Sequence, residues 1–306
     1  YAVAINNGGE VRAEPKLVFE GGRLVIKSDG GTVVNSGTLS AANDSGKGGS
    51  VDVVADSVTL GGSSHIDASG TQGGGDILVW GDSETFARGT LAARGGAGAG
   101  GFVEVSSPIS LNYGALTDTR ADDGTAGMLL LDPGAFTISG AAAGPNNVNT
   151  LDLVTSLGIS NVSLDTAAFP GGGAENITVT SPLAGSWAND LSLTAGNDIL
   201  INALISNGGA GSLNLTAVND IVVDGTAPET GQIVLTGGDL SFDAGNDVTT
   251  SGAVSTSSGG GVGIVAGRHV AINNAVVLGG GAFTAGVPGG ALIGGNFSSG
   301  ATGVIS

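Results

Sequence analysis

The sequence contains no cysteine, which excludes disulfide bonds, thiolate metal sites and cysteine nucleophiles. Aromatic residues make up only 4% of the chain. The buried side chains are therefore expected to be mostly Val, Ile, Leu and Ala, which suit a stack of thin layers better than one large core. No apolar run approaches about 18 residues, so we expect no membrane insertion. The first residues include no start methionine and no export signal, so we expect a section of a longer protein.

Basic residues are also scarce. The chain has 9 Lys and Arg against 27 Asp and Glu, which gives a formal net charge of -18 at pH 7. Residues 121–306 contain a single basic residue, Arg268. Nucleic-acid binding requires neutralisation of phosphates by cations, so we expect no nucleic-acid partner. We interpret the acidic surface as a device for solubility.

Glycine is abundant, with 59 residues in a chain of 306. Such a content suggests disorder where hydrophobicity is low, but 41% of this chain is hydrophobic and its mean hydropathy is +0.31. The chain is therefore expected to fold. Glycine permits sharp corners and the close approach of backbone segments, which a stack of coils requires.

A pattern of glycine pair, short apolar strand and polar turn recurs between Gly49 and Asp132. The equivalent residues Val51, Ile77, Val103 and Leu129 are each 26 residues apart. A period between about 20 and 50 residues is typical of solenoids, propellers and arrays. Each period contains several strand-like segments and no helical pattern, so we predict an all-β fold, a parallel β-helix.

The second half of the chain has its own register. The segments Leu191–Ile199, Leu213–Ile221 and Leu240–Val248 share an alternating strand followed by Asn-Asp and an apolar residue, and Val262–Val270 is a fainter copy. The asparagines of the first three copies are separated by 22 and 27 residues, as expected for coils whose corners vary in length. We predict a single β-helical solenoid domain over residues 1–306.

The regular pattern is interrupted in residues 132–173, which we interpret as a seam in this domain. Within it we predict one short helical insertion near residues 147–158. Asn147 or Asn149 can cap this helix, and Gly158 can end it. Its apolar residues recur every three positions: Val148, Leu151, Val154 and Leu157.

Three stretches resemble filamentous-haemagglutinin-like exoproteins. They are Ala4–Ala13 (AINNGGEVRA), Gly124–Pro133 (GTAGMLLLDP) and Trp187–Ile199 (WANDLSLTAGNDI). The resemblance implies a right-handed parallel β-helix as the shaft downstream of a secretion domain, exported from a Gram-negative cell by an outer-membrane two-partner transporter. It also implies a secreted or cell-surface location and no general catalytic residues.

The Asn-Asp pairs are the sharpest local signal. In stacked coils their asparagines would form a column of amides hydrogen-bonded from coil to coil. Their aspartates would form a second column, in which like charges about 4.8 Å apart repel. Either each aspartate caps its own turn, which is our preferred interpretation, or a cation bridges the column. The predicted structural column comprises Asn197, Asp198, Asn219, Asp220, Asn246 and Asp247.

Catalytic chemistry finds little support. Glycoside hydrolysis needs two carboxylates at a defined separation. Asp52, Asp76 and Glu104 lie on neighbouring coils, but the registers of Asp52 and Asp76 differ. His65 and His269 belong to coils that are far apart in sequence, so we expect neither a metal nor an acid-base pair. We predict no catalytic, metal or cofactor-binding residues and no enzymatic activity.

Trp80, Phe86 and Tyr113 could form an exposed patch that binds sugar or protein partners, although packing of each ring within the coils is the preferred interpretation. The sequence thus predicts the shaft of a large adhesin-like exoprotein that contacts a protein or glycan on a host or neighbouring cell. Two alternatives stay open. One is a self-assembling extracellular filament or biofilm-matrix subunit, because open solenoid ends expose unpaired backbone. The other is a β-helix enzyme that acts on polysaccharides.

Overall fold

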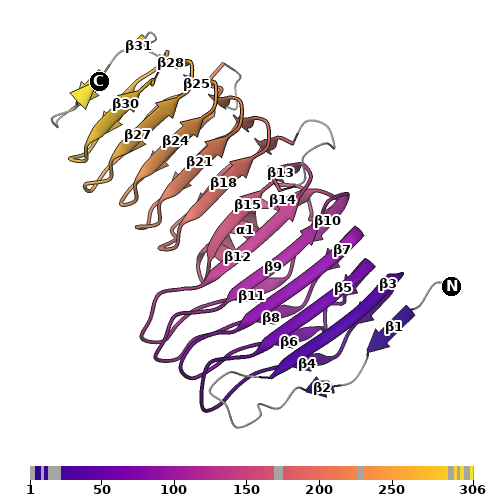
Figure 1. Cartoon of the computed structure of the whole chain (residues 1–306). Helices are drawn as coiled ribbons and strands as arrows, with labels where there is room; N and C mark the ends of the chain where they lie inside the picture. The colour runs from indigo at the N-terminus through magenta and orange to yellow at the C-terminus, as the bar shows by residue number, and fades with distance from the viewer. Residues whose placement is uncertain are drawn as a thin grey trace. The chain divides into compact units, whose positions relative to one another are not determined.

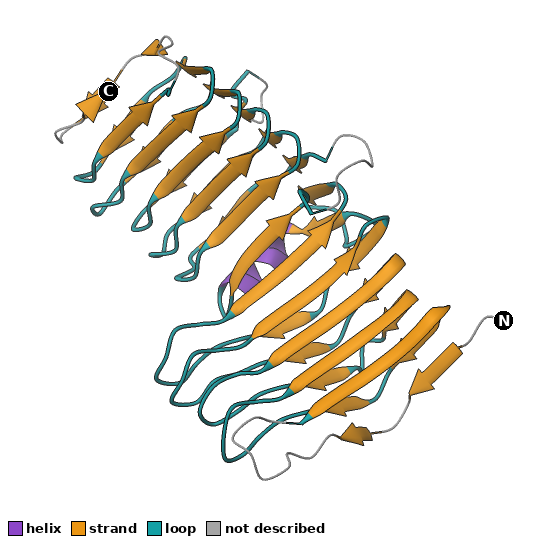
Figure 2. Cartoon of the chain, viewed as in Figure 1, coloured by secondary structure: helices purple, strands orange, loops and turns teal. Residues whose placement is uncertain are grey.

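The computed structural model describes residues 4–7, 10–12, 22–168, 175–226, 231–288, 293–294, 297–299 and 304–305. It forms two compact units. Unit 1 consists of Tyr1–Gly134, Ala142–Val148 and Ile159–Ser163, and unit 2 consists of Ala135–Ala141, Asn149–Gly158 and Leu164–Ser306. Each unit is a β-solenoid in which parallel strands of successive coils lie side by side (Figures 1 and 2). The predicted fold class is confirmed. A single domain over residues 1–306 stays a prediction.

The described residues of unit 1 contribute strands to two parallel sheets. The strands of its larger sheet are β1 (Ala4–Asn7), β3 (Arg23–Asn35), β5 (Ser50–Leu60), β7 (Asp76–Ala87), β9 (Phe102–Ser107) and β12 (Met128–Pro133), with β10 (Ser110–Tyr113) paired to β7. The strands of its smaller sheet are β2 (Glu10–Arg12), β4 (Thr38–Ser40), β6 (His65–Asp67), β8 (Thr90–Ala92) and β11 (Leu116–Asp118).

The period of 26 residues is the strand register of unit 1. Val51 pairs with Ile77, Ile77 with Val103, and Val103 with Leu129, as the sequence pattern predicted. These side chains are buried because successive residues of a strand point to opposite faces of the sheet, and every second one meets the interior of the coil. The register therefore stacks apolar side chains in columns inside the solenoid.

Glycine columns hold the coils of unit 1 close together. Gly49, Gly75, Gly101 and Gly127 stand at the same position of successive coils. A Cβ atom on any of the last three would lie closer than 3.0 Å to the carbonyl oxygen of the glycine one coil earlier. Only four of the described glycines have a positive φ, so close approach explains these columns better than turn geometry does.

Unit 2 contains three sets of parallel strands. The first comprises β18 (Leu191–Ala195), β21 (Leu213–Ala217), β24 (Leu240–Ala244), β27 (Val262–Ala266), β30 (Phe283–Gly286) and β33 (Val304–Ile305). The second comprises β13 (Phe136–Ser139), β16 (Ile177–Val179), β19 (Ile199–Ile201), β22 (Ile221–Val223), β25 (Asp247–Thr250), β28 (His269–Ile272) and β31 (Ile293–Gly294). The third comprises β17 (Leu183–Gly185), β20 (Leu204–Asn207), β23 (Gln232–Leu235), β26 (Val254–Thr256), β29 (Val276–Leu278) and β32 (Phe297–Ser299).

The second register is confirmed in unit 2. Leu191 pairs with Leu213, Leu213 with Leu240, and Leu240 with Val262, so strands separated by 22 or 27 residues lie in the same column. The extra residues of the longer step enter a corner and leave the strands aligned. Two further strands, β14 (Asn147–Asn149) and β15 (Asn161–Asp165), contain points at which the chain passes from one unit to the other.

The helical insertion is present, but its start differs from the prediction. Helix α1 spans Thr150–Leu157, and the side chain of Asn149 caps it by accepting a hydrogen bond from the N–H group of Leu151 at 2.8 Å. The buried residues are Leu153, Ser156 and Leu157, whereas the side chain of Leu151 is 71% exposed. Val148, the first residue of the apolar spacing, belongs to strand β14 and not to the helix.

Helix α1 has eight residues. Within the described ranges, no helix is both long enough and apolar enough to cross a membrane.

Candidate functional site

The asparagines of the predicted column are joined by their amide groups. Nδ2 of Asn197 donates to Oδ1 of Asn176 at 2.8 Å, Asn219 donates to Oδ1 of Asn197, and Asn246 donates to Oδ1 of Asn219 at 3.1 Å. Each asparagine lies just before a strand of the second set in unit 2, so the parallel register brings their side chains together. The amides thus form a ladder that runs from coil to coil.

The aspartates form the adjacent column, but they do not cap their own turns. Oδ1 of Asp198 accepts a hydrogen bond from the N–H group of Asp220 at 3.1 Å, and Oδ1 of Asp220 accepts one from the N–H group of Asp247 at 3.0 Å. Our preferred interpretation of Asx-type caps was wrong for these two residues, because the next coil places its N–H group against the carboxylate. Each bond offsets part of the repulsion between neighbouring charges.

Different residues occupy the two ends of the columns. At one end, Asn176 stands in the position of the aspartates, and its Oδ1 accepts from the N–H group of Asp198 at 3.1 Å. At the other end, Arg268 donates to both carboxylate oxygens of Asp247 at 2.9 and 2.6 Å, and Nδ1 of His269 lies 3.0 Å from Oδ1. The negative column therefore ends against a cation. Asn176 was missed, although it precedes Ile177 directly, as Asp198 precedes Ile199.

The alternative role of the aspartate column is to bind a cation. In the part of the chain that the structure describes, no group of three or more His, Asp or Glu side chains is arranged to hold a metal ion. The carboxylate oxygens instead accept hydrogen bonds from backbone N–H groups of the next coil. The arrangement favours a structural role for this column.

Neutralising the central aspartate tests this structural role. Asp220→Asn keeps the Oδ1 acceptor for the N–H group of Asp247 and removes repulsion of about 1 kcal/mol per neighbouring charge in water. We expect the free energy of unfolding to stay the same or to rise by up to about 1 kcal/mol. Asp220→Ala removes the acceptor as well and is expected to lower stability by about 1 kcal/mol. Urea unfolding with and without calcium would measure both. Stabilisation of the wild type by calcium that Asp220→Asn abolishes would contradict the structural role.

The pair of Asp247 and Arg268 should make stability depend on acidity. The side-chain hydrogen bond from Arg268 lowers the pKa of Asp247 from 3.8 to about 2. Between these values the unfolded chain binds the proton more readily, so stability falls as the pH falls. We expect Arg268→Ala to melt below the wild type near pH 5 and to converge with it near pH 2. Thermal melts by circular dichroism would measure this difference, and a difference independent of pH would contradict it. Lys27→Ala, which removes a cation from the exposed pair with Asp29, is the control for net charge.

The three carboxylates considered for catalysis do not form a pair. Asp52 and Glu104 both occupy the register position of Leu78, whose strand lies between theirs, while Asp76 pairs with Ser50. This agrees with the different registers predicted for Asp52 and Asp76. The Asp52 carboxylate also accepts a hydrogen bond from Nη2 of Arg23 at 2.8 Å. Asp52 and Glu104 thus occupy the same register position two strands apart, with Leu78 between them.

The two histidines lie in different units. His65 is half-buried in strand β6 of unit 1, between Thr38 and Thr90 in register. His269 lies in strand β28 of unit 2, where it contacts Asp247.

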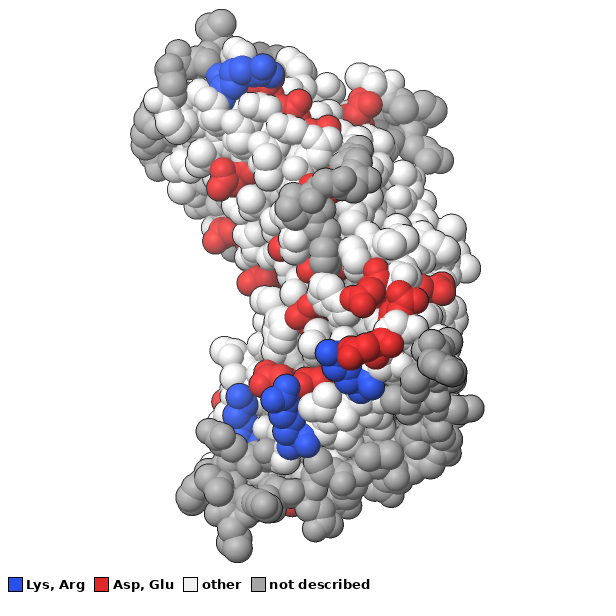
Figure 3. All heavy atoms as spheres, turned by 45° about the vertical axis from the view of Figure 1, so that its right-hand side comes forward, with Lys and Arg blue, Asp and Glu red and all other residues white. Residues whose placement is uncertain are grey.

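Basic side chains of unit 1 also lie beside acidic ones (Figure 3). Arg94 contacts the carboxylates of Asp118 and Asp122 at 3.7 and 3.2 Å, and Arg120 contacts Asp118 at 2.7 Å. Burial raises the pKa of Asp118, but hydrogen bonds from Arg120 and the charges of both arginines outweigh it, so the pKa is lowered. These cations are thus engaged with carboxylates of the same unit.

The aromatic residues considered as a patch are divided between core and surface. Tyr113 is fully buried, and its hydroxyl group lies 2.9 Å from Oγ1 of Thr117, so it fills the core as we preferred. Nε1 of Trp80 donates to Asp82 at 2.7 Å, and the guanidinium of Arg88 lies 4.2 Å from the ring centroid of Phe86. The predicted patch therefore lacks Tyr113.

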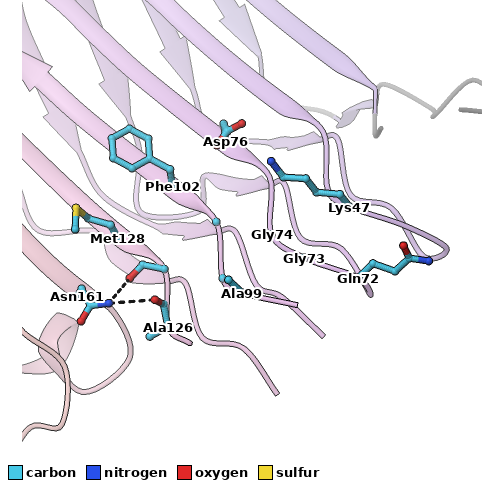
Figure 4. Close-up of a pocket in the computed structure, with 13 residues that line it drawn as sticks. Lys47, Gln72, Gly73, Gly74, Asp76, Ala99, Phe102, Ala126, Met128 and Asn161 are labelled. Atoms are coloured by element: carbon cyan, nitrogen blue, oxygen red, sulfur yellow. Dashed lines mark hydrogen bonds between the residues drawn. The ribbon is translucent and has the colours of Figure 1, made fainter. Parts of the chain in front are cut away.

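A surface groove of about 600 Å³ lies along the glycine columns of unit 1. Its floor is made by glycines and alanines of successive loops, because the absence of large side chains leaves this strip hollow. Asp76, Phe102 and Met128 follow one another at the starts of neighbouring strands along its side (Figure 4). We did not predict this groove from the sequence. Its signal was the glycine pair before each strand, followed by an exposed position that varies from coil to coil.

No protein-family model matches this chain, and no curated protein sequence matches it.

Proposed function

We propose that this chain is the non-enzymatic shaft of a large secreted or cell-surface adhesin-like exoprotein. The shaft would present contacts to a protein or glycan on a host or neighbouring cell. One observation carries the proposal: the repeated polar and glycine residues serve the stacking of coils, through the amide ladder of unit 2 and the glycine columns of unit 1. Such use of residues favours a stiff, extended scaffold over a catalytic centre.

The route of export belongs to the same proposal. The three stretches that resemble filamentous-haemagglutinin-like exoproteins support passage through an outer-membrane two-partner transporter of a Gram-negative cell. A chain without cysteine can cross as an unfolded polypeptide without forming disulfide bonds on the way. After export, backbone hydrogen bonds between coils would hold the structure together.

Electron microscopy combined with an assay of polysaccharide cleavage tests the proposal. We expect the purified protein to form isolated particles and to leave the chain length of neutral and acidic polysaccharides unchanged. Long regular fibres would instead support a self-assembling filament or matrix subunit. Shortening of a polysaccharide, measured as new reducing ends, would support an enzyme and overturn the proposal.

A further inference from the structure

The groove of unit 1 joins an apolar row to polar groups. Phe102 and Met128 are register partners on strands β9 and β12, and their side chains are 36% and 39% exposed. Asp76 continues the row on the neighbouring strand, with Lys47 near it and Gln72 farther out on its loop (Figure 4). Asn161 lies at the other end, where its Nδ2 donates to the carbonyl oxygens of Ala126 and Gly127.

The main chain of the groove floor is already used in hydrogen bonds. The N–H groups of Gly74 and Gly100 donate to the carbonyl oxygens of Ala99 and Thr125 on the next coil at 2.9 Å. The carbonyl oxygens of Gly75 and Gly101 accept from the N–H groups of Phe102 and Met128, the first residues of the strands on the next coil. An extended peptide that binds by adding a strand needs such groups to be open. The floor therefore favours a ligand recognised through side chains.

The charges of the groove and of the chain select against an anionic ligand. Lys47 and Asp76 carry one charge of each sign, while the whole chain carries -18. A polyanion would be repelled at long range, and one ammonium group offsets little of that repulsion. A pyranose ring offers an uncharged alternative, because its C–H face packs on apolar side chains while its hydroxyl groups reach carboxylate and amide partners.

We propose that this groove binds a neutral oligosaccharide, with a sugar ring packed on Phe102 and Met128 and its hydroxyl groups hydrogen-bonded to Asp76. The inference rests on the proposed function, of which it specifies the glycan contact. The lining comes from five successive coils, from Lys47 to Asn161. At about 4.8 Å per coil they span about 19 Å, which fits a short oligosaccharide better than a single sugar.

Affinity electrophoresis of the whole chain tests this inference, since its negative charge drives migration in native gels. The gels would contain hydroxyethyl cellulose, galactomannan or dextran as neutral polymers, and alginate as an anionic one. We expect at least one neutral polymer to retard the protein. Phe102→Ala should weaken this retardation about tenfold or more, because the packing surface for the ring is lost. Asp76→Asn should weaken it less, since the amide retains one acceptor oxygen.

Ile109→Ala is the matched control, because Ile109 is an apolar residue of the same unit, 65% exposed and outside the groove. It should be retarded like the wild type. Equal melting temperatures of the variants would show that any loss comes from the groove. Retardation by no neutral polymer, retardation by alginate alone, or a Phe102→Ala variant retarded like the wild type would each overturn the inference.

These results separate the groove from the proposed shaft. Isolated particles without retardation by neutral polymers would remove the oligosaccharide site and leave the shaft intact. Retardation that depends on Phe102, together with shortening of the polymer, would keep the site and overturn the non-enzymatic shaft. Free oligosaccharides should compete with the polymer and reduce the retardation of the protein. This effect should grow with oligosaccharide length until the oligosaccharide fills the groove, and longer ones should compete no better.

Discussion

Gly101→Ala is expected to lower the free energy of unfolding by about 3 kcal/mol. A Cβ atom at this position would lie closer than 3.0 Å to the carbonyl oxygen of Gly75, the C atom of Gly74 and the Cβ atom of Ala93. The first two are backbone atoms, which cannot move aside as the end of a flexible side chain can. The coil must therefore separate from its neighbour, and hydrogen bonds such as Phe102 N–H to Gly75 O at 3.0 Å would lengthen. Urea unfolding followed by far-UV circular dichroism would measure the loss.

Gly62→Ala is the matched control for this prediction. Gly62 lies in the same unit, and a Cβ atom there would meet no atom within 4 Å. We expect a change within about 0.5 kcal/mol, because alanine mainly reduces the entropy of the unfolded chain at such a position. If Gly101→Ala unfolded at the same urea concentration as Gly62→Ala, close packing of the glycine columns could not be what holds the coils together.

Asn207→Ala is expected to have a similarly large effect in unit 2, at about 3 kcal/mol. Its side chain is 1% exposed and makes four hydrogen bonds to the main chain. Oδ1 accepts from the N–H groups of Trp187 and Gly209 at 2.9 and 2.8 Å, and Nδ2 donates to the carbonyl oxygens of Trp187 and Gly211 at 3.0 and 2.9 Å. Alanine would leave these groups without the partner that now satisfies them, and a buried unsatisfied polar group costs about 1–3 kcal/mol.

Tryptophan fluorescence provides a local measurement of this change. Trp187 is 3% exposed, and a Trp80→Phe background would leave it as the only tryptophan of the chain. We expect its emission to shift to longer wavelength in Asn207→Ala, as the corner loosens and water reaches the ring. Asn202→Ala, at an exposed asparagine of the same coil, should change neither emission nor stability. If Asn207→Ala showed unshifted emission and unchanged stability, the four hydrogen bonds of Asn207 could not be what holds this corner together.

The local sequence pattern does not predict which side of helix α1 is buried or which groups the aspartates bind. An apolar spacing of three predicted an insertion near residues 147–158, and a helix is there, but the spacing does not coincide with its buried residues, Leu153, Ser156 and Leu157. Leu151 fits the pattern and is 71% exposed, because the strand against which α1 packs decides which side of the helix is covered. For Asp198 and Asp220, the next coil places a backbone N–H group within hydrogen-bond distance, and this outcompetes a cap within the turn.

By itself, the sequence determined the repeating unit and its inward face. Val51, Ile77, Val103 and Leu129 recur at a constant interval, which predicts stacked coils. In such a stack every strand keeps the same register, so the apolar residues of each strand face the interior together. Only the tertiary structure decided where the corners run. The groove, the four hydrogen bonds of Asn207 and the ends of the aspartate column all lie at corners or at the first or last residues of strands. Their partners come from other segments of the fold, and hydrogen bonds and close contacts depend on fractions of an ångström that a sequence period does not specify.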